Sequence, residues 1–480
     1  MENRFSGIGK ITSIPEEFYF SVLGFEISFT PRNSDGVLAL TDWVNDLNKT
    51  ETVDWFVGTS NEGESIYIEL CGEVSYSLRM PGEFGSATVS YRLMIRDEKF
   101  DAHEDLKFDE INFYGEDIDL INPPGRAIKT DEGGITFINP KEYKKEWCIK
   151  VNTEEFILIK DIAIQKTITY YDVPDLKKNI TSQIKFKFNE RKSFSDIYKY
   201  YEYMTVFLSF LTGRSVSSFE VELISNIEEI EGELSQRNLA VCINKGSLKI
   251  EVKKLQYHNV IQIDDIDNNI PNLFAVLNDN KNSPYLFFLP ETNDDKKFIK
   301  YTQIIDLSAS MEWEYLKQEP ERNEELILQS KELVEALVKF IGCFAVHPKV
   351  KEKALKVIRQ MLTSYQPSFK EKIEYLYYKY KDDLEYVTQY GYRELEFLEE
   401  NVFLKQIKSF VSMRNSGAHR KFEWKNGTDI FPHLMILVYF SVFERSGMDK
   451  IRVRECIKRG FFRIKFSSIF CNKIYSTYTS

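Results

Sequence analysis

Short runs in which apolar and polar side chains alternate dominate the first two hundred residues. From Gly24 onward, Phe25, Ile27 and Phe29 alternate with polar residues, a period of two that is typical of a half-buried strand. The pattern predicts strands at 18–30, 64–70, 87–95, 111–114, 134–138 and 156–169, and again at 218–224, 239–243 and 248–252. Glycine- and proline-containing turns separate these runs, which favours an antiparallel sandwich or barrel.

A helical period interrupts the strands once and then replaces them. Between Ile197 and Leu211 apolar residues recur every three or four positions, with Ser195 as the expected N-cap and Gly213 as the end. After about residue 295 the pattern predicts helices at 304–319, 323–346, 350–365, 369–390, 392–413 and 428–443. Alternation at 462–466 allows a final strand. The expected fold is α+β: a β-rich domain at 1–295 with an inserted helix, then an all-α bundle at 296–480 with a basic C-terminal tail.

Charge is distributed unevenly along the chain, whose net charge is −11. Residues 1–300 carry 34 Lys and Arg against 50 Asp and Glu, whereas residues 401–480 carry 15 against 5. A polyanion such as RNA, if the protein binds one, is therefore expected at the C-terminal end. A solvated basic face is the alternative interpretation of the same charges.

Cysteines and apolar runs indicate the compartment. Six scattered cysteines form no CxxC pair and no Cys/His cluster with zinc spacing, which is typical of reduced thiols. The N-terminus lacks the apolar core of a signal peptide, and the longest apolar run, 434–440, is far shorter than the ~20 residues that cross a bilayer. We expect a cytoplasmic protein without membrane contact, metal site or cofactor.

Arg414 and His419 are the candidate chemical groups. Arg414 follows Phe410 by four residues on the apolar face of the helix predicted at 392–413, so it should emerge at the end of a buried seam. The small residues at 416–418 are expected to form a turn that brings His419 back toward the arginine. A guanidinium binds phosphate and an imidazole transfers protons near neutral pH, while RNA supplies its own nucleophile, the 2′-hydroxyl. The alternative is a surface Arg and His at a helix–loop–helix junction.

The segment Arg414-Asn415-Ser416-Gly417-Ala418-His419 resembles the signature of the HEPN superfamily, Arg-polar-x-x-x-His between two helices of an α-helical domain. The resemblance covers about residues 300–450. It implies an acidic partner on an earlier helix, for which Glu312 is the candidate and Glu314 the competitor. It also implies a metal-independent endoribonuclease that works as a homodimer with a shared cleft.

The first half resembles, more loosely, the N-terminal domain of ApeA-type abortive-infection proteins. Gly9, Pro15 and the stretch 107–113 carry this resemblance, although the tryptophan that usually follows is absent from 116–120. The resemblance implies anti-phage defence in which the N-terminal domain senses a phage protein.

The roles that the resemblance implies fit the chemistry of the residues. His419 would take the proton of the 2′-hydroxyl or protonate the leaving 5′-oxygen, and Arg414 would stabilise charge on the phosphorane. Asn415 would orient the phosphate or the imidazole, and Glu312 completes the set. The product would be a 2′,3′-cyclic phosphate, and an RNA with exposed loops, such as tRNA, would be a suitable substrate.

Other functional interpretations stay open. A non-catalytic HEPN-type scaffold for RNA or protein is one, and a ligand- or carbohydrate-binding β domain fused to a helical oligomerisation domain is another. Among single residues, His103 is a weak metal candidate, Asp264-Asp265-Ile266-Asp267 is expected to be loop charge rather than a Ca²⁺ site, and His433 is a supporting candidate. Tyr375, Tyr377, Tyr378 and Tyr380 are expected to pack a helical bundle rather than stack on bases.

Overall fold

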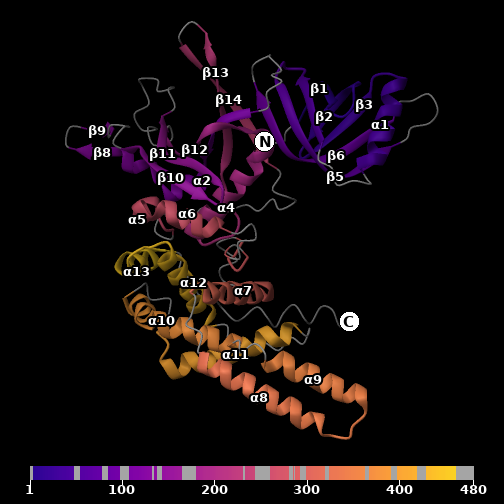
Figure 1. Cartoon of the computed structure of the whole chain (residues 1–480). Coiled ribbons are helices and arrows are strands. Elements are labelled where there is room, and N and C mark those ends of the chain that lie inside the picture. Colours follow the sequence, from indigo (N-terminus) through magenta and orange to yellow (C-terminus); the bar gives the residue numbers. More distant parts are fainter. Residues whose placement is uncertain are drawn as a thin grey trace, which may run out of the picture. The chain divides into compact units, whose positions relative to one another are not determined.

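The computed structural model describes residues 4–47, 54–77, 85–97, 107–131, 134–137, 143–164, 180–230, 233–243, 260–279, 285, 287–291, 299–318, 324–362, 367–390, 397–418 and 429–460 (Figure 1). The chain divides into two compact units. Unit 1 comprises Met1–Thr212, Val216–Tyr257 and Gln262–Asp279, and unit 2 comprises Gly213–Ser215, His258–Ile261 and Asn280–Ser480. The boundary expected between residues 295 and 296 falls inside unit 2.

Unit 1 is built on one twelve-stranded sheet in the order β10-β11-β12-β7-β13-β14-β6-β3-β2-β1-β4-β5. Six of these strands close on themselves, because β5 also pairs with β6. The ring consists of β1 (Arg4–Ile11), β2 (Glu17–Leu23), β3 (Glu26–Pro31), β4 (Asp54–Ser60), β5 (Ser65–Ser77) and β6 (Ser86–Asp97). The expected antiparallel sandwich or barrel is therefore a six-stranded barrel that continues into an open sheet.

Alternation of side chains fills the barrel, as the period of two predicts. Inward-facing residues of every strand are buried, and the core includes Phe18, Phe20, Phe29, Phe56 and Tyr91. The helix α1 (Ser34–Leu47) packs against β3 and β5, and its Trp43 ring meets Phe29 at a centroid distance of 6.0 Å. The barrel thus has a continuous apolar interior.

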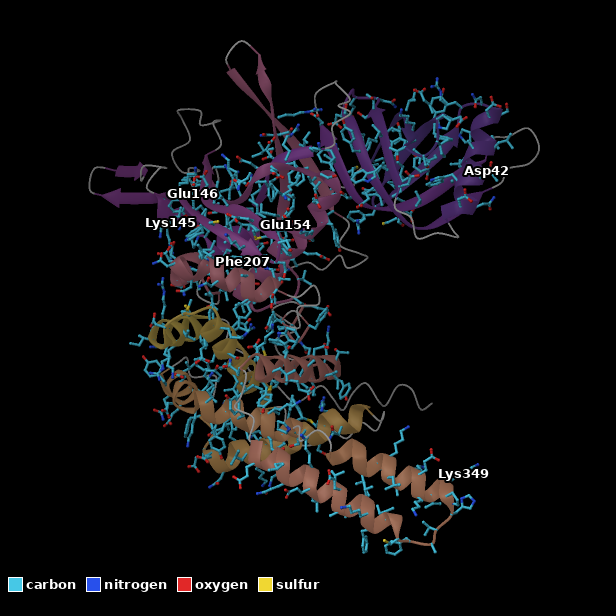
Figure 2. The ribbon with its side chains drawn as sticks, in the orientation of Figure 1. Asp42, Lys145, Glu146, Glu154, Phe207 and Lys349 are labelled. Carbon is cyan, nitrogen blue, oxygen red and sulfur yellow. The ribbon has the colours of Figure 1, made fainter. Side chains whose placement is uncertain are left out.

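The open half of the sheet carries helices on one apolar surface. Its strands are β7 (Lys107–Tyr114), β10 (Lys145–Val151), β11 (Glu154–Ile164), β12 (Ile180–Ser193), β13 (Glu220–Ile230) and β14 (Glu233–Ile243). Rings from α4 (Ile197–Thr212) and α6 (Ile270–Asn278) meet those of β11 and β12: Phe274 contacts Phe156, Phe186 and Phe207 (Figure 2). Aromatic packing therefore fixes the inserted helix on the sheet.

An ionic anchor fixes the same helix. The carboxylate of Glu154 on β11 accepts hydrogen bonds from Lys199 at 2.6 Å, Lys192 at 3.0 Å and the hydroxyl of Tyr200 at 3.0 Å (Figure 2). The bond from Lys199 is the largest cause that lowers the pKa of Glu154 to about 2. Smaller elements complete the unit: α2 (Glu116–Ile121), α5 (Ile263–Ile266) and the two-stranded sheet β8 (Ile128–Asp131) and β9 (Gly134–Phe137).

Unit 2 is helical in its described residues. Its helices are α7 (Tyr301–Lys317), α8 (Glu324–Gly342), α9 (Pro348–Leu362), α10 (Phe369–Tyr390), α11 (Glu400–Ala418), α12 (Phe431–Arg445) and α13 (Lys450–Arg459). α12 is buried over nearly its whole length and packs against α7, α10 and α13, which makes it the centre of the bundle. None of the helices that the structure describes is both long and apolar enough to cross a membrane.

The structure confirms the α+β class and corrects several elements. The strand expected at 18–30 is a hairpin, because Gly24 adopts a positive φ of 62° between β2 and β3. The predictions missed α1, α2, α6 and α13. The cap near residue 195 is Ser193, which begins a short 3-10 helix, Phe194–Asp196, before α4. The strands expected at 248–252 and 462–466, and the end of the one at 156–169, lie outside the described residues.

Close contact between β1 and β4 requires glycine, which gives a test of the barrel. A Cβ atom on Gly9 would lie 2.5 Å from the Cα atom of Gly58, backbone that cannot move without opening the strand pair. We expect Gly9→Ala to lower the free energy of unfolding by about 1–3 kcal/mol in chemical denaturation, the usual cost of overpacking. Gly125→Ala is the control, because its Cβ would have no neighbour within 4 Å. Equal stability of the two variants would contradict the close packing.

Candidate functional site

Arg414 lies inside a helix rather than at its end. α11 continues to Ala418, so the turn expected at residues 416–418 is wrong: these residues extend the helix. One glycine in a helix costs only about 1 kcal/mol relative to alanine, and no proline or β-branched residue follows Arg414 within this turn. The adjacent Asn415 is exposed.

An aromatic ring and a carboxylate hold the Arg414 side chain. Its Cζ atom lies 4.4 Å from the centroid of the Phe369 ring at the start of α10, a cation–π contact. Its Nη2 atom lies 3.5 Å from Oε2 of Glu312 on α7. The Arg414 and Glu312 side chains are 30% and 32% exposed, so both still reach solvent. The guanidinium is thereby oriented without being buried.

A second cation, which the sequence analysis missed, completes the cluster. Nζ of Lys372 on α10 lies 3.5 Å from Oε1 of Glu312, and this lysine side chain is only 14% exposed. Arg414 and Lys372 therefore flank one carboxylate from two helices. Both distances are long for charge-assisted hydrogen bonds, which usually measure about 2.7–2.9 Å. An anion that approaches this cluster would meet two positive groups already positioned.

Tyr301 connects the beginning of α7 to the last turns of α11. Its hydroxyl donates a hydrogen bond of 2.9 Å to the carbonyl oxygen of Arg414. Partial burial raises the pKa of Tyr301, and the positive charge of Arg414 opposes that rise, so the hydroxyl stays protonated and able to donate. This contact fixes the backbone from which the Arg414 side chain projects.

His419 lies outside the described residues and directly follows the last residue of α11. On a continuing helix, residues five apart would point about 140° away from each other. Convergence of His419 and Arg414 on one phosphate therefore requires either that the chain leaves the helix after Ala418 or that the two groups come from different copies of the chain.

The two acidic candidates on α7 have different surroundings. Glu314 is fully buried and accepts hydrogen bonds from Nε of Arg445 at 3.0 Å, Nη2 of Arg445 at 2.7 Å and the hydroxyl of Ser441 at 2.6 Å. The hydroxyl of Tyr285 also donates to Glu314 and accepts from Arg445, and burial, together with the charge of Glu314, raises the pKa of Tyr285 well above its usual value. Only Glu312 of the two contacts Arg414.

His433 does not support this cluster. It is buried on α12, where its Nδ1 atom lies 3.2 Å from the carbonyl oxygen of Asp429 and its ring meets Phe403 at 6.2 Å. Eleven residues of α11, about 16 Å, separate Phe403 from Arg414. His433 lines a separate cavity of about 210 Å³ beside Tyr377 and Thr388. The supporting role considered for it is therefore wrong.

The remaining candidates divide between packing and surface. Asp264 lies in the short helix α5 rather than in a loop, and it pairs with Lys160 and Arg126, each at 2.6 Å. Tyr377 stacks on Phe403 and Tyr380 stacks on Phe440, whereas Tyr375 and Tyr378 are exposed. His103 lies outside the described residues. Within the described ranges, no three His, Cys, Asp or Glu side chains are grouped to hold a metal ion.

Comparison with known families identifies unit 1. The sequence model of the ApeA N-terminal domain 1 matches residues 24–277, more than half of the chain. The chain belongs to the ApeA N-terminal domain 1 family. The match supports the weaker of the two resemblances and with it an ApeA-type anti-phage defence protein. No curated protein and no solved structure matches the chain.

Substitution separates the structural carboxylate from the candidate one. Glu314→Gln leaves the buried Arg445 without its counter-charge, and we expect it to lower the free energy of unfolding by about 3–5 kcal/mol. Glu312→Gln removes two solvent-accessible contacts of 3.5 Å and should change that free energy by about 1 kcal/mol or less. Thermal and chemical denaturation of both variants measure the difference. A larger loss for Glu312→Gln would assign the structural role to the wrong residue.

Proposed function

We propose that this ApeA-family protein is a metal-independent endoribonuclease of anti-phage abortive infection. The observation that carries the proposal is the Arg414 cluster: a guanidinium oriented by Phe369, a second cation at Lys372 and a carboxylate between them, one residue turn before His419. Two convergent cations suit a phosphodiester, and an arginine fork matches phosphate geometry.

Cleavage would use the RNA's own nucleophile. His419 takes the proton of the 2′-hydroxyl, the 2′-oxygen attacks phosphorus, and the bond to the 5′-oxygen breaks as that oxygen gains a proton. Arg414 and Lys372 stabilise the negative charge that develops on the phosphorane oxygens. Asn415, exposed beside Arg414, hydrogen-bonds to the phosphate or the imidazole. The products are a 2′,3′-cyclic phosphate and a 5′-hydroxyl.

Glu312 would keep the two cations in place before RNA binds. It lies within 3.5 Å of both, so without it Arg414 and Lys372 would repel each other and move apart. A phosphate entering between them would replace the carboxylate as their counter-charge, and the long starting distances make that exchange inexpensive. Glu312 is thus a positioning residue in the proposal.

Unit 1 would provide control. We infer from family membership that the N-terminal domain senses a phage protein, and that infection releases a nuclease that is otherwise silent. The RNA substrate would present an unpaired loop, as tRNA does, because in-line attack needs a free 2′-hydroxyl and a flexible backbone.

Cleavage in the presence of a chelator tests the function. Purified protein is mixed with total cellular RNA in excess EDTA, and the termini are probed for 2′,3′-cyclic phosphate. We expect His419→Ala to slow cleavage by about 10²–10⁴-fold, the usual contribution of general acid–base catalysis. Arg414→Lys should also be impaired, since it keeps the charge but loses the fork. Growth arrest on overexpression gives the readout if a trigger is needed. Variants that cut as fast as wild type would place the site elsewhere, and binding without cleavage would favour an RNA-binding scaffold.

Lys372 allows a separate test of phosphate contact. We expect Lys372→Ala to weaken RNA binding and to reduce the slope of log affinity against log salt by about 0.7, the value of one phosphate contact on a single strand. Lys381→Ala is the matched control: it lies on the same helix about 13 Å away and pairs with Glu400. Fluorescence anisotropy over a salt series measures both. Equal slopes for the two variants would remove Lys372 from the site.

A further inference from the structure

The helices α8 and α9 form a hairpin with one row of residues turned inward. Val334 is buried, and Val338 and Ile341, four and seven residues later, are half-buried, so this row marks the side of α8 that faces α9. Leu355 and Ile358 are the half-buried counterparts on α9. Among hairpin residues whose exposure is described, Val334 is the only buried one. Figure 1 shows α8 and α9 side by side.

Each helix also carries a second apolar row that the hairpin itself does not cover. On α8 and the turn after it, this outer row is Leu333, Leu337, Phe340 and Phe344, at spacings of four, three and four. On α9 it is Val350, Ala354 and Val357, which line a shallow groove with Ile358. The large side chains Leu333, Phe340, Phe344, Val350 and Val357 are between 42% and 61% exposed. This spacing is that of a seam between packed helices.

The charges beside the outer rows decide what covers them. α8 has four acidic and two basic residues, whereas α9 has five basic residues and one acidic residue. On α8, the exposed Glu325 and Glu332 flank the outer row; on α9, the exposed Lys349, Lys353 and Lys356 flank it on the corresponding side. An acidic seam and a basic seam on one hairpin are complementary to the same hairpin turned around a two-fold axis.

We propose that the α8–α9 hairpin is a self-association surface, on which the outer row of α8 packs against the outer row of α9 in a second copy of the chain. Two-fold symmetry makes the contact twice, so that two hairpins form a four-helix bundle. Pairing of α8 with α8 would instead place Glu325 and Glu332 against like charges, which disfavours that arrangement. This inference stands on the hairpin and does not depend on the nuclease activity.

Removal of the outer row tests the interface in the full-length chain. Wild type is expected to be a dimer at micromolar concentration by sedimentation equilibrium. The double variant Phe340→Ser, Val350→Ser should raise the dissociation constant at least 100-fold with an unchanged melting temperature of the monomer, because both side chains are already exposed. Ile451→Ser, which alters a residue on α13 that is 73% exposed, is the control and should remain a dimer. A monomeric wild type, or a double variant that stays dimeric, would overturn the proposal.

Charge reversal tests the pairing of unlike helices. Glu325→Lys, Glu332→Lys makes α8 basic, and Lys349→Glu, Lys356→Glu makes α9 acidic, so each double variant alone should be monomeric. Mixed in equal amounts, the two should form a heterodimer through one restored seam, α9 of the second against α8 of the first. Failure of the mixture to associate while wild type dimerises would reject this pairing.

The same preparations keep this proposal distinct from the nuclease. A dimer that does not cut RNA, even when overexpressed, contradicts the proposed function alone, whereas a cutting monomer contradicts the hairpin interface alone. If residues 461–480 cover the outer rows instead of a second copy, wild type is monomeric and Phe340→Ser, Val350→Ser lowers its melting temperature, which also overturns the proposal.

Discussion

The rotation of α7 about its own axis depends on one buried ion pair. Glu314 is held by Arg445 and Ser441 of α12 and by Tyr285, with no exposure to solvent. Residues two apart on a helix point about 200° away from each other, so the pair that draws Glu314 inward turns Glu312 outward, toward α10 and α11. The geometry around Arg414 therefore follows from an interaction in which none of its members takes part. A buried pair of this kind adds little net stability, but it makes alternative rotations of α7 very unfavourable.

The hydrophobic pattern was sufficient for elements with an uninterrupted period. It gave the bounds of α10 as the structure has them, because apolar residues recur without a break from Phe369 to Tyr390. It failed where a capping residue imitates a turn: Asn33 accepts a hydrogen bond from the amide of Gly36, which begins α1 rather than a loop. It also failed at the end of α11, where small polar residues were taken as a stop, although they continue the helix at small cost.

The candidate site could be predicted only in part. Arg414 was found from its position on an apolar helix face, but Lys372 carries no signal, because 60 residues separate it from Glu312 and it reaches Glu312 only through the packing of α10 on α7. The choice between Glu312 and Glu314 likewise depends on the direction in which each side chain points, which a helical period alone does not fix without knowledge of the core. Family membership reaches residue 277 and so describes unit 1, while the chemistry proposed for unit 2 rests on its own contacts.

Barrel closure leaves the twelve-stranded sheet with one unpaired border among the described strands. β5 returns to β6, so the terminal strand at the other end, β10, alone has a single partner in that sheet. Its exposed Lys145, Glu146 and Lys150 line this border (Figure 2 labels the first two). Charged side chains at a sheet border oppose the addition of a strand from another molecule, which is the first step of fibril growth. The fold thereby protects its own solubility at high concentration, even though half of it is a large sheet.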